Sequence, residues 1–417
     1  MNIEARMNRN LSRTLWLAFF QVFLIFLPIA VPFFQSKGLS MQEVFALQAL
    51  FAVLVVVMEV PSGYLADLFG RRRMLIVGSL FSGLGTTVLL FAEGFVGLAL
   101  FEACLAVAHS LVSGADIAMA YDSALAARRD RNEQAQVVGR LYAARTLSEA
   151  SAALLLSALL IFVAVDTAML IQAVIGWLPL LLSLTLVEPP GPRLRASGSA
   201  DQRHGAALRA VWVLLWQHSA VLRLCFLALC IWSLTTFNAV WLVQQLWTEQ
   251  GVELKHFGYL WSALALITAL SGRYAHQAER ALGVGGLLSV IALLPVFGYL
   301  LLDQLGVLGG VLVSVSFFVA RGLGLVVLRD ALNRRVPSEI RATANSLASF
   351  GFRGAFAVTG PLVGYAFDLW GMRTTLLLLA LVSTVIALAI VLPLALAVRF
   401  ERADPKGAAE ACGPAGP

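Results

Sequence analysis

The chain is a series of twelve long apolar runs separated by short polar breaks. A helix that crosses a bilayer needs about 20 apolar residues, so each run predicts one membrane-spanning helix. Only 13% of the 417 residues are charged, against about a quarter in soluble proteins. The runs cover residues 16–34, 44–61, 74–91, 97–119, 137–165, 168–187, 222–246, 259–273, 284–302, 306–328, 342–367 and 374–398. We therefore predict an all-α membrane protein of twelve transmembrane helices, with little room for a soluble domain.

Basic residues gather in every second break between the runs. Alternation from the first run assigns to one side Arg6, Arg9, Arg13, Arg71, Arg72, Arg73, Arg128, Arg129, Arg131, Arg193, Arg195, Arg280, Arg334, Arg335, Arg399 and Arg402. The other side carries only Lys37, Lys255 and Arg373. Because cytoplasmic loops carry the excess of Lys and Arg, we expect both termini in the cytoplasm and a bacterial inner membrane as the location. The same rule explains the net charge of +6 without a nucleic-acid partner.

A polar central stretch divides the chain into two halves. Residues 188–218 begin with a segment rich in Pro, Gly, Ser and charge, which predicts a cytoplasmic linker, and end in an interfacial helix. The predicted lobes are 1–187 and 219–398, and the tail 399–417 is expected to be disordered.

The two halves share an internal repeat at a separation of about 208 residues. The matched pairs are Gly63 with Gly272, Asp122 with Asp330, and Arg145 with Arg353. Such a repeat predicts two six-helix units related by a pseudo-two-fold axis, with a substrate site near the midplane between them.

The break after the second run contains the sequence GYLADLFGRRR, residues 63–73. It resembles the cytoplasmic signature of the major facilitator superfamily, G-x-L-A-D-x-x-G-R-[RK], and the resemblance implies twelve spans and transport by alternating access. Gly63 and Gly70 would allow a tight turn and close helix approach. Asp67 would accept hydrogen bonds from a helix N-terminus, while Arg71 and Arg72 would grip acidic groups. The resemblance thus implies a gating latch; the alternative is that the arginines serve topology alone.

Two departures limit the resemblance to drug/proton antiporters of that superfamily. Their fifth span usually ends in G-P-x-x-G-G, whereas residues 145–151 read RTLSEAS. The arginine early in their fourth span is also missing, since residues 101–104 read FEAC.

Several ionisable side chains fall inside the predicted spans. Each costs about 2.5 to 3.5 kcal/mol at mid-bilayer depth, so they must face protein or water; they are Glu59, Glu102, His109, Asp116, Arg145, Glu149, Arg321 and Arg353. Glu102, His109 and Asp116 recur every seven residues, which predicts one polar stripe on a continuous helix. Glu102 could instead snorkel to the outer surface, and His109 could be a hydrogen-bonded packing residue. We interpret Asp116 as a proton-coupling residue.

The fifth span carries Arg145 and Glu149 four residues apart, on one helix face. They form either a structural ion pair or a site in which Glu149 exchanges a proton for Arg145. Arg321 and Arg353 add two buried guanidinium groups, and guanidinium favours carboxylate or phosphate. This predicts an anionic solute, unless the arginines pair with acids to hold the halves together.

Polar residues also line one face of the seventh span. Asn238, Trp241 and Gln245 follow at spacings of three and four, which predicts a surface that can hydrogen-bond to and stack on an organic ligand. Gln21, on the first span, is assigned to the same substrate-binding set as Arg145, Arg321, Arg353 and His109.

Together these patterns predict a secondary active transporter of a small organic solute. We expect proton-coupled efflux of a drug or metabolite, such as a siderophore-like acid, with Asp116 and Glu149 as proton carriers. Uptake of an organic anion and transport of a lipid or lysolipid are the alternatives. No Walker A, HExxH or suitably placed GxSxG motif supports an enzyme, and the cysteines lack metal-ligand spacing. We expect no cofactor beyond the proton gradient, and as partners the solute and membrane lipids around a monomer.

Overall fold

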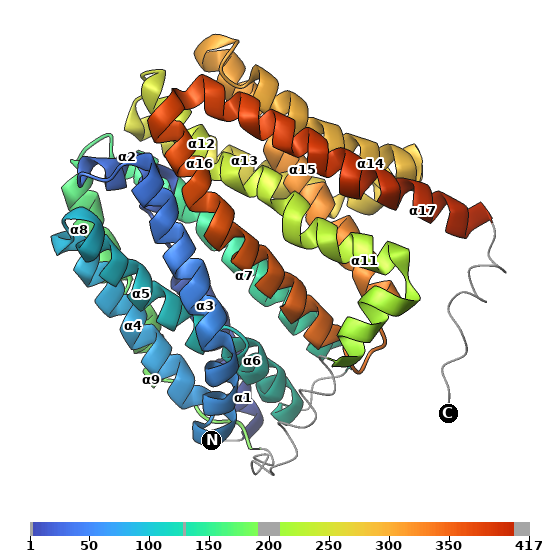
Figure 1. Cartoon of the computed structure of the whole chain (residues 1–417). Coiled ribbons are helices and arrows are strands. Elements are labelled where there is room, and N and C mark those ends of the chain that lie inside the picture. The colour runs from blue at the N-terminus through green and yellow to red at the C-terminus, as the bar shows by residue number, and fades with distance from the viewer. Residues whose placement is uncertain (1–2, 128–130, 191–208, 404–417) are drawn as a thin grey trace. The chain divides into compact units, whose positions relative to one another are not determined.

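The computed structural model describes residues 3–127, 131–190 and 209–403, which are helical almost throughout and contain no strand (Figure 1). The chain divides into two compact units, of residues 1–197 with 252–265 and of residues 198–251 with 266–417. The linker and tail predictions at 191–208 and 404–417 lie outside the described residues. The lobe boundaries predicted from the sequence stay predictions.

Unit 1 contains the helices of the first half. Their bounds are α1 Ile3–Gln21, η1 Leu27–Ile29, α2 Ala30–Ser36, α3 Met41–Phe69, α4 Arg71–Phe91, α5 Gly94–Val112, α6 Ala115–Ala126, α7 Arg131–Leu159, α8 Val165–Ile175 and α9 Leu178–Leu184. The first part of α13, Leu254–Arg273, also belongs to this unit. The unit is held together by α5, which packs along both α3 and α4, and by α1, which packs against α6, α7 and α9 (Figure 1).

Unit 2 contains the remaining elements. They are η2 Leu214–His218, α11 Ala220–Leu227, η3 Ala228–Trp232, α12 Ser233–Glu249, the rest of α13, α14 Ala275–Leu301, α15 Gly306–Arg335, α16 Arg341–Ile386, η4 Ala387–Val391 and α17 Leu392–Ala403. Its core surrounds Trp232, which is 1% exposed and lies on a π-helical turn.

The helices have the length and composition of membrane spans. Eight stretches of the described residues are long and apolar enough to cross a bilayer. The longest, Arg341–Arg399, has 59 residues and a non-helical glycine, Gly371 with φ +74°, so it is long enough for two crossings. The remaining predicted runs lie on α1 with α2, on α7 and on α13. The predicted all-α membrane fold is confirmed.

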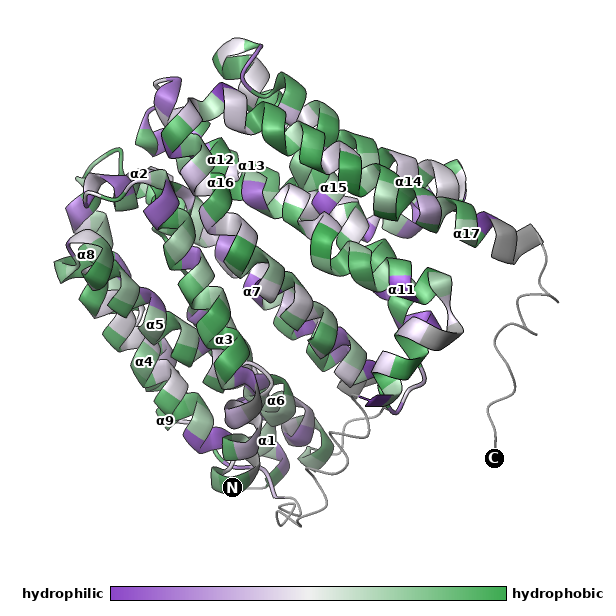
Figure 2. Ribbon diagram, in the orientation of Figure 1, coloured by the Kyte–Doolittle hydropathy of each residue, from purple (hydrophilic) through white to green (hydrophobic). Residues whose placement is uncertain are grey.

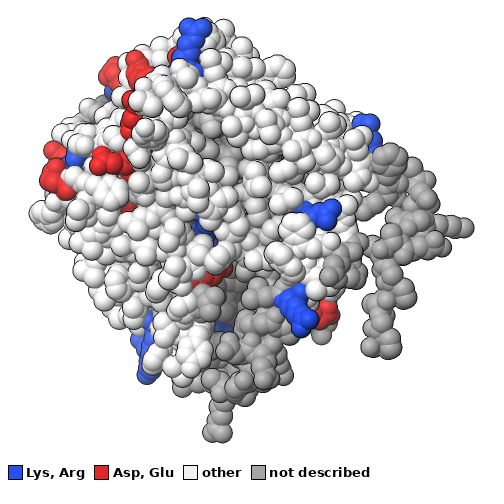
Figure 3. Space-filling view, viewed as in Figure 1, with Lys and Arg blue, Asp and Glu red and all other residues white. Residues whose placement is uncertain are grey.

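The surface of the helices suits a lipid environment. Apolar residues cover most of their length (Figure 2), and wide areas of the described face in Figure 3 carry no Lys, Arg, Asp or Glu. Phe91, Val96 and Leu308 are 78%, 81% and 74% exposed. Exposed apolar area of this extent would be an aggregation hazard in water, whereas in a bilayer it meets acyl chains.

The first span is broken between α1 and η1. Gln172 of α8 compensates for the break, because its Oε1 accepts from the Ile25 N–H at 2.6 Å and its Nε2 donates to the Phe23 carbonyl at 3.3 Å. Gln172 is 1% exposed. A buried amide side chain thus satisfies backbone groups that lipid could not.

The fourth span is broken as well. α5 ends at Val112, and α6 begins at Ala115 after Gly114, whose φ of +84° is a conformation that favours glycine. The break creates a new helix N-terminus within the span and places Asp116 in its first turn.

Candidate functional site

The break in the fourth span positions a buried ion pair. Asp116 is fully buried, and its Oδ2 accepts a hydrogen bond and ion pair from Arg145 Nη2 of α7. Its Oδ1 accepts from the Ile117 N–H at 2.8 Å, as an acid in the first turn of a helix can. The Arg145 guanidinium also lies 5.8 Å from the ring of Tyr142 and remains 27% exposed. The buried Asp116 carboxylate and the partly exposed Arg145 guanidinium therefore neutralise each other's charge.

The predicted polar stripe of the fourth span is wrong. Its seven-residue spacing assumed a continuous helix, but Gly114 separates Asp116 from the helix that carries Glu102 and His109. Glu102 is 4% exposed and accepts from Gln48 Nε2 of α3 at 2.8 Å, so it does not snorkel to the surface. His109 is exposed, with its ring 5.9 Å from that of Phe51.

Arg145 and Glu149 do not pair with each other among the described residues, although four residues separate them. Arg145 is joined to Asp116, while Glu149 Oε1 accepts from Trp261 Nε1 of α13 at 3.3 Å. Next to that contact, Ser262 Oγ donates to the Ala150 carbonyl at 2.8 Å. α7 thus carries an ion pair toward α6 and a hydrogen-bonded carboxylate toward the first part of α13, all within unit 1.

In unit 2, two of the predicted residues, Arg321 and Trp241, contact Phe237. The Arg321 guanidinium of α15 lies 5.3 Å from the Phe237 ring, and Trp241 packs edge-on against it at 6.3 Å. Phe352 and Phe356, on either side of Arg353 in α16, contact the same ring at 5.3 and 4.8 Å. Two arginine-bearing helices and α12 therefore meet at one aromatic residue, which the sequence analysis did not single out.

The polar face of α12 is buried. Asn238, Trp241 and Gln245 are 4%, 5% and 8% exposed. Among the residues that the structure describes, no hydrogen-bond partner is present for Asn238 Oδ1, Trp241 Nε1 or Gln245 Oε1. Gln21 Oε1, at the end of α1 in unit 1, is also buried and has no partner in the described part of the chain. Such groups are rare in folded proteins and call for an explanation, which a polar ligand would supply.

The latch residues lie at the start of α4. Gly70 has φ +89° and sits against the carboxylate of Glu188, which accepts from the N–H groups of Arg71 and Arg72 at 3.1 and 2.9 Å. The Arg71 side chain forms an ion pair with Asp122 of α6, and Arg72 Nη2 donates to the Leu184 carbonyl at 3.1 Å.

The end of α9 is also tied to α1. Asn10, 1% exposed, exchanges two hydrogen bonds with the Val187 backbone at 2.9 and 3.0 Å and donates to Ser123 Oγ at 2.8 Å. Arg13 Nη1 donates to the Thr185 carbonyl at 2.6 Å. These bonds fix residues 185–188 against α1 and α4.

The expected turn at Gly63 is wrong. α3 continues through Pro61 to Phe69, so most of the signature is helical and only Gly70 turns. Gly63 lies inside this helix, and a Cβ placed on it would meet nothing within 4 Å. Pro61 does not end the helix, because the hydrogen bond that it removes is the one from its own nitrogen to an earlier carbonyl. The helix then continues to Phe69. The side chain of Asp67 lies outside the described part of the structure.

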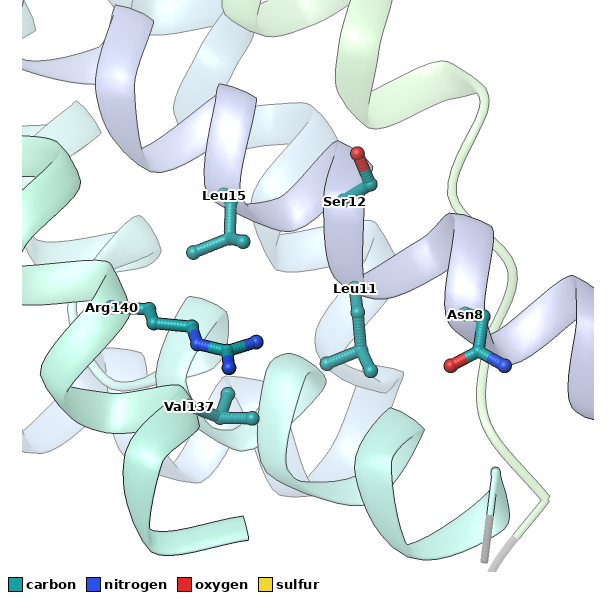
Figure 4. A pocket seen from close by; sticks show the side chains of 6 residues that line it. All are labelled: Asn8, Leu11, Ser12, Leu15, Val137 and Arg140. Atoms are coloured by element: carbon teal, nitrogen blue, oxygen red, sulfur yellow. The ribbon is translucent and has the colours of Figure 1, made fainter. Parts of the chain in front are cut away.

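One cavity of about 170 Å³ opens between α1 and α7 (Figure 4). Asn8, Ser12 and Arg140 supply its polar lining, and Leu11, Leu15 and Val137 its apolar lining. Arg140 precedes the end of α7 by about 29 Å at 1.5 Å per residue, close to the thickness of a hydrocarbon core. The cavity therefore lies about one hydrocarbon thickness from the far end of α7.

Sequence reasoning missed several residues that bind the site together. Gln48, Gln172 and Trp261 are lone polar or amphipathic residues within apolar runs, and that isolation was a usable signal. Asn10 and Glu188 lie at the ends of the spans, where polar residues are ordinary. Their contacts join positions 177 and 116 to 117 residues apart, and no local pattern announces such pairs.

Charged and amide groups buried among membrane-spanning helices are typical of proteins that move solutes or protons across a membrane. A profile of the Major Facilitator Superfamily matches residues 13–328. The chain belongs to this family, as the signature predicted, and it is a secondary transporter of a small solute rather than an enzyme. None of the curated proteins matches the chain in sequence.

Solved transporters share the fold at low sequence identity. The crystal structure of nucleoside transporter NupG has a TM-score of 0.71 at 14% identity and covers 94% of this chain and 98% of that one. A peptide transporter POT in complex with sulfate has a TM-score of 0.69 at 16% identity, covering 96% and 99%. An inward-facing bacterial homolog of the human lysosomal transporter Spinster has 0.66 at 14% identity, covering 99% and 98%.

Proposed function

We propose that the protein is a proton-coupled transporter of a small organic anion in a bacterial inner membrane. The observation that carries the proposal is the ion pair between buried Asp116 and partly exposed Arg145. The proton gradient supplies the energy, and no other cofactor enters the cycle. The protein works as a monomer with both termini in the cytoplasm.

The ion pair couples a proton to an anion through one guanidinium. While Asp116 is ionised, it neutralises Arg145. A proton on Asp116 removes that partner and leaves the partly exposed Arg145 guanidinium free to pair with another anion. Glu149, half-buried on the same helix, is the second proposed proton carrier. Proton and anion binding therefore support each other.

Recognition in unit 2 rests on charge and on buried polar atoms. Arg321, Arg353 and the α12 atoms of Asn238, Trp241 and Gln245 form the proposed solute-binding set there, and Arg145, His109 and Gln21 form it in unit 1. Guanidinium recognises carboxylate and phosphate groups, while Trp241 and Phe237 offer aromatic surface. A small aromatic or aliphatic acid fits this chemistry.

The direction of transport separates two candidates. The sequence favours efflux of a drug or metabolite, which requires proton and solute to compete. The pairing of Asp116 with Arg145 instead favours joint binding, because a proton on Asp116 frees Arg145. Under an inward proton gradient, joint binding means uptake. We therefore rank uptake of an organic anion first and proton-exchange efflux second.

A ligand screen followed by vesicle transport tests the proposal. Ligands that bind only the folded state raise its apparent melting temperature, so detergent-purified protein is screened against organic acids, lipophilic cations, zwitterions and lysolipids. Acids should stabilise the protein, and Arg353→Ala and Arg321→Gln should remove the effect. Arg280→Gln, at an exposed position of α14, is the matched control. Stabilisation by lipophilic cations alone would overturn the anion proposal.

The best acid is then followed in proteoliposomes of known orientation. An inward proton gradient should drive its accumulation, and Asp116→Asn should abolish the drive, whereas Asp166→Asn, at an exposed acid outside the site, should not. Accumulation driven by an outward proton gradient instead would establish efflux by exchange.

The cavity between α1 and α7 favours a second candidate, transport of a lipid or lysolipid. It combines Arg140 with an apolar floor, and basic pockets between spans on the cytoplasmic side bind anionic headgroups. Stabilisation by anionic lysolipid, lost in Arg140→Gln and unmatched by any soluble acid, would replace the leading proposal with this one.

A further inference from the structure

A second buried carboxyl group lies in unit 1, apart from the Asp116–Arg145 pair. Glu102 of α5 is 4% exposed, and its Oε1 accepts from Gln48 Nε2 of α3 at 2.8 Å. Glu102 follows the start of α5 by eight residues, or about 12 Å. It therefore lies at hydrocarbon depth.

No cation forms an ion pair with Glu102 among the described side chains. Lys37, in the loop between α2 and α3, forms an ion pair with Glu93 at 2.8 Å. The helices packed along α5 are α3 and α4. α4 carries its charges, Arg71 to Arg73, in its first turn, at the opposite end of the span from the start of α5 and about 15 Å or more from the level of Glu102.

The other titratable groups on these helices are carboxyl groups, phenols, one thiol and one exposed imidazole. On α3 they are Glu43, five residues before Gln48, and Glu59, Tyr64 and Asp67, all eleven or more residues beyond it. On α5 itself they are Cys104 and exposed His109, and on α6, which contacts α5 much less than α3 and α4 do, they are Asp116, Tyr121 and Asp122. Asp116 is already paired with Arg145.

The Gln48 N–H can be accepted by either form of Glu102, so the burial of the group and the absence of a nearby cation among the described side chains decide between acid and carboxylate. A carboxylate offers acceptors only, so an ionised Glu102 would have one amide N–H against a full buried charge. A carboxylic acid offers one donor and one acceptor, which matches the carbonyl and NH₂ of a carboxamide. An unpaired charge at this depth costs several kcal/mol, whereas a neutral acid–amide pair avoids that cost.

We infer that Glu102 and Gln48 form a proton-binding site in the membrane, with Glu102 holding a proton in this conformation. The site is separate from Asp116 and lies on the other half-helix of the fourth span. With the orientation proposed above, Glu102 is the acid nearer the periplasm and Asp116 the acid nearer the cytoplasm. If the proposed function holds, a proton that moves inward would reach Glu102 before it reaches Asp116. The protonated state itself does not depend on transport.

Difference infrared spectroscopy of the protein in proteoliposomes tests the inference without any solute. The wild type at neutral pH should show the carbonyl band of a protonated carboxylic acid, shifted in D₂O, and Glu102→Gln should lack it. Asp166→Asn should keep the band. An alkaline step should remove the band reversibly if Glu102 exchanges protons with solvent.

Two results would overturn the inference. Equal spectra of the wild type and Glu102→Gln at neutral pH would mean that Glu102 is ionised. A band that survives every alkaline step up to unfolding would mean a static hydrogen bond rather than a proton-binding site. Gln48→Leu provides an independent readout should Glu102→Gln fold poorly, because the band should persist but move when the amide partner is lost. An unmoved band there would contradict the pairing.

The transport assay then separates this inference from the proposed function. With the acid identified by the ligand screen, Glu102→Gln should retain solute counterflow and lose at least tenfold in proton-driven accumulation. Retention of both would limit Glu102 to a structural role even if the proton coupling through Asp116 holds.

Discussion

At the scale of single residues, the Asp116–Arg145 pair depends on where each charge lies relative to solvent. Asp116 is fully buried and Arg145 keeps 27% of its side chain exposed, so the acid depends on the arginine more than the arginine depends on the acid. The Ile117 N–H and the new helix end add further stabilisation to the carboxylate. Replacement of Arg145 should thus destabilise the ionised form of the Asp116 carboxyl group.

A double-mutant cycle measures this pair. Removal of one partner from a buried pair costs about 3–5 kcal/mol, and partial exposure of Arg145 should reduce this to about 2–3 kcal/mol. We expect Arg145→Gln and Asp116→Asn each to lower the unfolding free energy, and the double variant to cost less than their sum. If the changes in unfolding free energy of the two single variants add up to that of the double variant, the two residues are not energetically coupled.

The residue-scale predictions failed where a distant partner competed with a local one. The spacing of Arg145 and Glu149 correctly predicts that they share a face of α7, but Arg145 pairs with Asp116, 29 positions away, and Glu149 with Trp261, 112 positions away. Local periodicity carries no information about which helix lies opposite. The functional roles assigned to Asp116, Glu149 and the arginines stay predictions.

At the scale of elements, the two broken spans differ in how their free backbone groups are satisfied. In the fourth span, Gly114 allows the turn, and the Asp116 carboxylate accepts from the Ile117 N–H at the new helix end. The break in the first span depends on another helix, because Gln172 of α8 binds the Ile25 N–H and the Phe23 carbonyl. The shape of the first span is thus set partly by the sixth.

We expect Gln172→Leu to destabilise unit 1. The variant leaves a buried N–H and a buried carbonyl without partners, which costs about 1–3 kcal/mol for each strongly desolvated group. Thermal unfolding in detergent should show a clear drop in melting temperature. Met169→Leu, at a buried neighbour on α8 that is 2% exposed, controls for packing and should change little. Equal effects of the two variants would remove the assigned role of Gln172.

The start of α4 has an unusual cap, because its acceptor comes from Glu188, just beyond the sixth span, rather than from the preceding residue. Glu188→Ala should lose about 1 kcal/mol of stability, the typical value of an N-cap. Glu188→Gln should lose less, because its carbonyl can still accept one N–H. Glu4→Gln, at an exposed acid of α1, is the control, and an order of Gln below Ala in melting temperature would contradict capping.

At the scale of the whole molecule, the sequence predicted the fold well because bilayer thickness fixes helix length. Apolar runs of about 20 residues therefore locate spans without knowledge of partners, and both the all-α membrane fold and the family are confirmed. The breaks at Val22–Phe26 and Ser113–Gly114 were missed because hydropathy averages over them. A helix that ends and restarts within apolar residues leaves no trace in such an average.

The topology prediction is tested by chemical labelling in a variant whose native cysteines are replaced. Phe162→Cys, 85% exposed between α7 and α8, should react with an impermeant maleimide added to intact cells. Ser338→Cys, exposed between α15 and α16, should react only after the membrane is opened. The reverse pattern would invert the orientation and the order of Glu102 and Asp116.

The hydrogen bonds that hold residues 185–188 also determine how a mechanical load would enter unit 1. Asn10, Arg13 and the start of α4 bind this segment directly. Tension applied to the chain beyond Pro190 would therefore act first on α1 and α4, and it would reach α9 only after those bonds had ruptured. The hydrogen bonds of residues 185–188 would therefore protect α9 from being unfolded by a force on the chain that follows it.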